Sequence, residues 1–220
     1  FHTPDTYKGM PPESYRNDVV EHWNEHTASL EYRSAADEQG AHVYLSADNG
    51  LTWEYSGKGP NSIHGGIELA SGRILVVGYR KVAPNIALYT ADPNELKWER
   101  LFLFEPPTLP GRRFGEPHIV QLLSGRIVLM LRSTAIPYDD ASDSNFLWVA
   151  WSDDECRTWS DLQRTDLLGF PPHLYRLADG RVLCSYGRRL SPYGERVCVS
   201  DDGINWDVRR ERILRDDADG

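Results

Sequence analysis

The chain has few cysteines, no long apolar run and no excess of basic residues. Its three cysteines, Cys156, Cys184 and Cys198, form no C-x-x-C pair, so they predict neither a disulfide scaffold nor a structural metal site. Apolar runs such as Ile74–Val77 and Ile127–Leu131 are far shorter than the roughly 20 residues that a membrane-spanning helix needs. The sequence therefore predicts no membrane span, no metal and no cofactor.

Acidic residues outnumber basic ones, with 33 Asp and Glu against 24 Lys and Arg, and the net charge is −9. The average field of such a chain repels a phosphate backbone, so nucleic acid is not an expected partner. The chain is punctuated by 18 Gly and 14 Pro, and it has 7 Trp, 11 Tyr and 6 Phe to pack on pleated surfaces. This composition favours a β-rich globular chain over a long helical bundle.

A turn of the form Ser-x-Asp-x-Gly-x-Thr-Trp spans Ser46–Trp53, and three degenerate copies end at Trp98, Trp159 and Trp206. We call these four segments the Asp turns. Their tryptophans are 45, 61 and 47 residues apart, close to the length of one four-stranded propeller blade. Side chains of Ser and Asp in such turns bond to the turn's own backbone, so we expect the Asp turns to be structural.

A second marker has the same period. The dipeptide Gly-Arg occurs at 72–73, 125–126 and 180–181, each time between apolar runs, which is typical of a tight hairpin between buried strands. Each repeat thus reads as strand, Gly-Arg turn, strand, loop, strand, Asp turn, strand. The expected fold is all-β: one β-propeller domain over 1–220 with four-stranded antiparallel blades and repeats at about 18–58, 59–105, 114–165 and 169–212.

Both kinds of turn lie at one end of each blade, because the chain crosses the sheet twice between them. The other end collects the residues that precede each first strand and those that close each second strand. Four arginines, Arg33, Arg80, Arg132 and Arg188, are expected to close second strands there. Guanidinium groups that converge repel one another unless an anion lies between them, so this end can bind an anionic ligand; the alternative is that each Arg faces solvent or pairs with a carboxylate.

Three histidines, His64, His118 and His173, precede first strands at the same end. They can act in proton transfer or hydrogen bonding, or they can be satisfied structural residues. Cys184 and Cys198 flank an expected hairpin and can face each other across it, although buried free thiols are the simpler interpretation.

The chain resembles the exo-sialidase (neuraminidase) family with Asp-box repeats through most of its length. The resemblance rests on Arg33 and Asp37 before the first Asp turn, on His64–Leu69 before the next Gly-Arg turn, and on Glu116 followed by Arg132. It implies a sialidase-like propeller in which Asp37 is the general acid/base and Glu116 is the base that activates a tyrosine nucleophile. Arg132 would be one of three arginines that clamp a sialic-acid carboxylate.

The remaining clamp positions follow less directly from the resemblance. The chain has no Phe-Arg-Ile-Pro motif, and Arg188, Arg189 and Arg196 are all candidates for the third clamp arginine. A propeller of about six blades, at about 45 residues each, exceeds this length. We therefore expect about four blades of a longer ring, completed by further sequence or by self-association with another chain.

Three functional interpretations follow. The first is a glycosidase that releases a terminal acidic sugar, with sialic acid as the first candidate and a sialoglycan or other acidic glycan as the partner. The second is a propeller enzyme that acts on another polysaccharide through His64, His118 or His173. The third is a carbohydrate-binding propeller without catalysis. The resemblance favours a secreted or periplasmic location.

Overall fold

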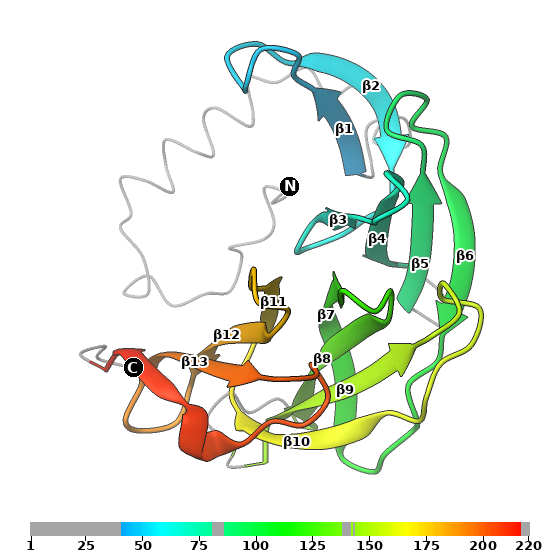
Figure 1. Ribbon diagram of the computed structural model, residues 1–220. Coiled ribbons are helices and arrows are strands. Elements are labelled where there is room, and N and C mark those ends of the chain that lie inside the picture. Colours follow the sequence, from blue (N-terminus) through cyan, green and yellow to red (C-terminus); the bar gives the residue numbers. More distant parts are fainter. Residues whose placement is uncertain (1–40, 81–85, 138–141, 143, 217–220) are drawn as a thin grey trace, which may run out of the picture. The chain divides into compact units, whose positions relative to one another are not determined.

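The computed structural model describes residues 41–80, 86–137, 142 and 144–216. Their strands form four separate sheets, and within each sheet strands that follow one another in sequence pair antiparallel (Figure 1). One sheet has two strands, β1 (Ala41–Leu45) and β2 (Glu54–Gly59), which flank the first Asp turn. They are the outer half of the first expected repeat, whose inner half falls in 1–40, outside the described residues.

Three sheets have four strands in the order expected for propeller blades. The first contains β3 (Gly66–Glu68), β4 (Ile74–Tyr79), β5 (Ile86–Ala91) and β6 (Glu99–Phe104). The second contains β7 (Arg112–Gln121), β8 (Ile127–Ala135), β9 (Phe146–Ser152) and β10 (Gln163–Leu168). The third contains β11 (His173–Arg176), β12 (Val182–Arg188), β13 (Gly194–Ser200) and β14 (Arg212–Arg215), with a 3-10 helix η2 (Val208–Arg210) before β14.

The second sheet is buried on both faces, and β8 shows why. Ile127, Leu129 and Leu131 lie in one hydrophobic cluster together with residues of the first sheet. Val128 and Met130 point the other way, into a cluster shared with the third sheet. Because side chains alternate along a strand, a continuous apolar run fits a strand that is covered on both sides. The expected all-β fold of stacked four-stranded blades is confirmed.

The Gly-Arg turns are hairpins, as predicted. Gly72, Gly125 and Gly180 have φ angles of 79°, 90° and 89°, a region that glycine enters without steric cost. Arg126 reaches from its turn to the Asp turn of the same sheet, where its guanidinium donates to both carboxylate oxygens of Asp153 at 2.6 and 2.8 Å. This contact confirms that both kinds of turn share one end of the blade.

The Asp turns are closed by their own side chains. In the third one, Asp154 accepts from the Thr158 amide at 2.8 Å and from the Thr158 hydroxyl at 2.7 Å. These hydrogen bonds, led by the one from the Thr158 side chain, lower the pKa of Asp154 to about 2. The aspartates of the Asp turns are therefore anionic structural groups.

The third Asp turn differs from the first and the fourth in one contact. The indole N–H groups of Trp53 and Trp206 donate to the carbonyl oxygens of Gly50 and Gly203. In the third turn Cys156 takes the glycine position with φ of 70°, and among the described residues the indole N–H of Trp159 finds no hydrogen-bond partner. Loss of the glycine thus accompanies loss of the contact.

The cysteines behave as buried thiols. Cys184 lies directly opposite Cys198 in the β12–β13 register, and both are free and buried, as is Cys156. Burial raises the pKa of the Cys156 thiol to about 12. The ranges that the structure covers contain no helix long and apolar enough to cross a bilayer.

We expect Asp202→Ala to lower the melting temperature by about 3–8 °C, because it leaves the amides of Ile204 and Asn205 without their acceptor, Asp202 Oδ1. Asp202→Asn keeps an acceptor oxygen and should cost less. Thermal unfolding followed by circular dichroism measures both. An unchanged melting temperature in Asp202→Ala would contradict the structural role of the Asp turns.

Candidate functional site

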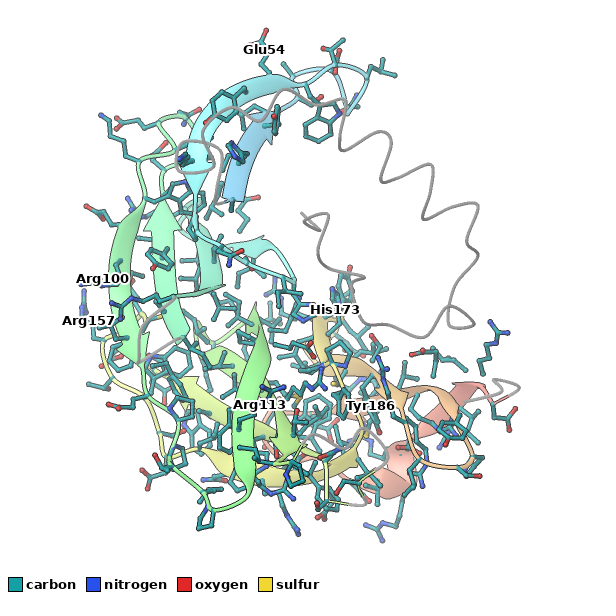
Figure 2. All side chains as sticks on the ribbon, turned by 180° about the vertical axis from the view of Figure 1, so that it is seen from behind. Glu54, Arg100, Arg113, Arg157, His173 and Tyr186 are labelled. Carbon is teal, nitrogen blue, oxygen red and sulfur yellow. The ribbon has the colours of Figure 1, made fainter. Side chains whose placement is uncertain are left out.

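The end of the blades without tight turns gathers the residues singled out in the sequence. His64 lies two residues before β3, Glu116 and His118 lie in β7, and His173, labelled in Figure 2, is the first residue of β11. They come from three successive sheets, in line with the expectation that equivalent positions of neighbouring repeats meet at this end.

Glu116 is presented by an irregularity in the β7–β8 ladder. Gly115 pairs with Arg132 and His118 pairs with Met130, so the register shifts between them. At this bulge Glu116 has φ of 43°, in the left-handed region that non-glycine residues seldom adopt. A bulge re-aims side chains, and the regular pairing on either side holds the unfavourable conformation in place.

The carboxylate presented in this way meets a guanidinium. Glu116 Oε2 lies 2.7 Å from Arg132 Nη1, and only 26% and 13% of the two side chains are exposed. A partly buried ion pair is screened less by water and salt than a surface pair. Arg132 also donates from Nε to the Thr134 hydroxyl at 2.8 Å, which fixes the plane of its guanidinium.

Phe170, from the segment between the second and third sheets, forms the floor under Arg132. The centre of the Arg132 guanidinium lies 3.7 Å from the centroid of the Phe170 ring, and that of Arg189 lies 5.4 Å from it. The ring is 1% exposed, and the Phe170 amide donates to Gly187 O at 2.8 Å. Such cation–π contacts strengthen when they are desolvated. No sequence pattern points to Phe170, because an isolated Phe in a loop belongs to no repeated motif.

The three histidines form a row across the sheets. The ring centroids of His64 and His118 are 6.0 Å apart, and those of His118 and His173 are 4.2 Å apart. His118 is buried, and its Nδ1 accepts a hydrogen bond from the Leu174 amide at 3.1 Å, which links the second and third sheets. Because Nδ1 is an acceptor, neutral His118 has its proton on Nε2.

Burial favours the neutral form of His118 and His64. Desolvation, with smaller effects from His173 and His64, lowers the pKa of His118 to about 3. Desolvation also lowers the pKa of His64; Glu116 opposes this shift, while His173 adds to it. Among the residues that the structure describes, no group of three or more His, Cys, Asp or Glu is arranged to hold a metal ion.

The other candidate arginines have different positions. Arg196 lies in β13 and is 2% exposed; its guanidinium donates to the carbonyl oxygens of Glu195, Pro192 and Arg215, so it ties its own sheet together. Arg188 ends β12, where it pairs with Gly194. Arg33 and Asp37 lie outside the described residues.

The four arginines were expected to be equivalent, and for Arg132 this is wrong. Arg80 directly follows β4 and Arg188 ends β12, but β8 continues beyond Arg132 to Ala135. Arg132 also lies six residues after the arginine of its Gly-Arg turn, whereas Arg80 and Arg188 lie seven after theirs. A shift of one residue along a strand turns a side chain to the opposite face, and this is why Arg132 meets Glu116.

A second polar group, which sequence reasoning missed, lies inside the third sheet. Tyr186, labelled in Figure 2, is 2% exposed and donates its hydroxyl hydrogen to Glu211 Oε2. Arg196 Nε lies 3.7 Å from the other carboxylate oxygen of Glu211. Burial and the neighbouring carboxylate raise the pKa of Tyr186, so the phenol stays protonated. This network is internal to its blade.

The fold and the polar site at one end of its blades define a propeller of Asp-turn repeats. A family model for the BNR repeat-like domain matches residues 8–217, and the chain belongs to this family. A search of curated protein sequences gives no significant match.

Solved structures share the fold. The chain is similar to a protein of unknown function from Dyadobacter fermentans, with 25% identity and a TM-score of 0.62 over 80% of this chain and 52% of that one. It is also similar to an α-L-arabinanase from Penicillium chrysogenum (15% identity, TM-score 0.57, 80% and 59%) and to a Hadza microbial sialidase (19%, 0.53, 66% and 36%). The chain thus spans between 36% and 59% of the length of these three proteins.

We expect His118→Ala to destabilise the fold by about 1–3 kcal/mol, because the buried Leu174 amide loses its acceptor. His118→Asn offers an oxygen near the position of Nδ1 and should restore part of the loss. Chemical denaturation of the three proteins at pH 7 measures these differences. Equal stability of wild type and His118→Ala would contradict the link between the sheets.

The same residue gives a pH prediction. The pKa of His118 is about 3 in the fold against an ordinary value of 6.5, so the folded state binds fewer protons than the unfolded state between these values. The contribution of His118 to the free energy of unfolding should therefore be fully present above pH 6.5 and should fall as the pH drops toward 3. In His118→Asn this dependence should be shallower. Titration of the assigned His118 imidazole near pH 6.5 in NMR spectra of the folded protein would contradict the prediction.

Proposed function

We propose that this propeller is a glycoside hydrolase that releases a terminal acidic sugar, with sialic acid as the first candidate substrate. The observation that carries the proposal is the Glu116–Arg132 pair, in which a carboxylate and a guanidinium are partly desolvated at the end of the blades that lacks the Asp turns. Membership in the BNR repeat-like family supports it, as does the presence of a sialidase and an arabinanase among proteins of similar fold.

The arginines argue for an acidic substrate. Arg132 and Arg189 approach the ring of Phe170 at 3.7 and 5.4 Å, so two positive groups share one buried floor. Like charges brought together are stabilised by an anion between them, and a planar guanidinium binds a carboxylate through two parallel hydrogen bonds. In this proposal Arg132, Arg189 and Arg33 hold the sugar carboxylate, with Arg188 near the rim.

The catalytic roles follow the division expected for two carboxylates in different environments. Glu116, paired with Arg132, would accept the proton of a tyrosine nucleophile, and Asp37 would protonate the leaving group. We assign no residue as the nucleophile, because Tyr186, whose hydroxyl donates to Glu211, is internal to its blade. We further propose that 1–220 is one propeller domain whose ring is completed by further blades.

A second candidate is an enzyme that acts on a different polysaccharide through the histidine row. It is favoured by the three imidazoles within 6.0 and 4.2 Å of each other and by the neutral state of His118. An α-L-arabinofuranosidase from Fusarium graminearum is also similar in fold, with 17% identity and a TM-score of 0.57 over 79% of this chain. A propeller that binds a glycan without catalysis is the third possibility.

Hydrolysis of fluorogenic glycosides separates these candidates. We expect release from a 4-methylumbelliferyl sialoside, no release from the corresponding arabinofuranoside, and at least a 100-fold loss of kcat/KM in Glu116→Gln. Glu99→Gln, which changes a carboxylate at the turn end, serves as the matched control and should leave the rate unchanged. Activity on the arabinofuranoside alone would favour the second candidate, and sugar binding without turnover the third.

The role of Asp37 can be tested separately. If it protonates the leaving group, Asp37→Ala should slow hydrolysis of an alkyl or glycan-linked substrate far more than that of an aryl glycoside, whose leaving group needs little protonation. Glu116→Ala should slow both to a similar extent. Steady-state kinetics on the two substrate types measure the difference. Equal losses in Asp37→Ala would remove the proton-donor role.

A further inference from the structure

His64 has an unsatisfied nitrogen at the candidate site. Its Nε2 is shielded from solvent and finds no hydrogen-bond partner in the described part of the chain. Leaving a buried polar atom without a partner lowers stability, and native proteins rarely accept this without a reason. In the neighbouring His118, Nδ1 accepts a hydrogen bond from the Leu174 amide. The missing hydrogen bond is therefore a feature of His64 and not of every histidine in the row.

The surroundings of His64 are those of a site and not of a core. Its ring stands edge-on to His118 at 6.0 Å, and the charge of Glu116 acts on it. His64 precedes β3 in the first sheet, whereas Glu116 and His118 belong to β7 in the second. The imidazole and the carboxylate thus come from two neighbouring blades.

We propose that His64 is a substrate-contacting residue, and that its Nε2 together with the Glu116 carboxylate binds two neighbouring hydroxyl groups of the sugar. The proposal rests on the proposed function and deepens it, because it names the part of the substrate that this side of the site recognises. Arg132 and Arg189 take the acidic group, and the imidazole and carboxylate take a neutral diol.

The chemistry of the two groups suits a diol. An ionised carboxylate only accepts hydrogen bonds, and a neutral imidazole has one donor and one acceptor nitrogen. A hydroxyl group can do both, so one sugar hydroxyl can donate to Glu116 while its neighbour bonds to His64 Nε2. The sugar hydroxyl then supplies the hydrogen-bond partner that His64 Nε2 lacks in the described part of the chain.

Neutrality of His64 is part of the proposal. The charged group that acts on it is Glu116, which is paired with Arg132, and the titratable groups beside it are the other two imidazoles, His118 and His173. Protonation of His64 would place a cation beside Glu116 and draw the carboxylate away from the sugar. Because burial lowers the pKa of His64, binding should persist below pH 6.5 and weaken only in more acidic solution.

A stability measurement tests His64 without any sugar. His64→Leu removes the unsatisfied nitrogen, so we expect its melting temperature to equal or exceed that of wild type, as happens when a residue is kept for binding at the expense of stability. His42→Gln, on β1, is the control for loss of a histidine elsewhere. A clear fall in the melting temperature of His64→Leu would show a structural histidine and overturn the proposal.

Binding separates the two ring nitrogens. A glutamine amide reaches the position of Nε2, whereas an asparagine amide reaches that of Nδ1. By isothermal titration with N-acetylneuraminic acid and with arabinobiose, we expect His64→Gln to stay within about 3-fold of wild type. We expect His64→Asn and His64→Leu to lose about 10-fold or more for whichever sugar binds. Equal affinity in all three variants would overturn the proposal.

The two proposals fail in different ways. If wild type binds arabinobiose and not N-acetylneuraminic acid, the acidic-sugar function fails, while the order of the His64 variants still supports the diol contact. If wild type binds neither sugar, the proposed function is contradicted and the diol contact falls with it, whatever the melting temperature of His64→Leu. If binding is intact and the variants do not differ, only the inference about His64 is lost.

Discussion

The structure depends on β8 being covered on both faces. Its alternate side chains enter two separate hydrophobic clusters, one shared with the sheet before it and one with the sheet after it. A single sheet with two apolar faces cannot be stable alone, so each blade needs neighbours, and equivalent strands are brought side by side. The polar site follows from this stacking, because equivalent ends of first strands, remote in sequence, then meet.

The site itself arises where the β7–β8 strand pairing is irregular. The bulge after Gly115 gives Glu116 its left-handed conformation and aims its carboxylate at Arg132, and Phe170 from the following segment fixes the guanidinium from below. The Asp turns at the other end differ, because their polar groups bond within the turn. Asp154, for example, accepts hydrogen bonds from Ser152 and Thr158 of its own turn. One end of the blade is closed by local hydrogen bonds, and the other presents groups to one another across blades.

Membership in the BNR repeat-like family limits the function without fixing it. Proteins of similar fold include an arabinanase and a sialidase, and the identities of 15% and 19% carry the fold alone. In our proposal the sugar is selected by side chains at this end of the blades: two guanidinium groups over Phe170, a carboxylate on a bulge and a row of imidazoles. The proposal assigns this combination to a substrate that carries both an acidic group and hydroxyl groups.

The sequence by itself determined the blade. The signals it used are local: apolar runs mark buried strands, and Gly-Arg dipeptides and Asp turns mark the tight turns between them. Together they predicted the strand order within each blade correctly. Glu116 and Arg132 were also named from sequence. Only the tertiary structure decided that Arg132 is turned toward Glu116, that Phe170 lies beneath it, and that Arg196 is buried within its sheet. A register shift of one residue and a contact between blades leave no local pattern, because both depend on how distant segments pack.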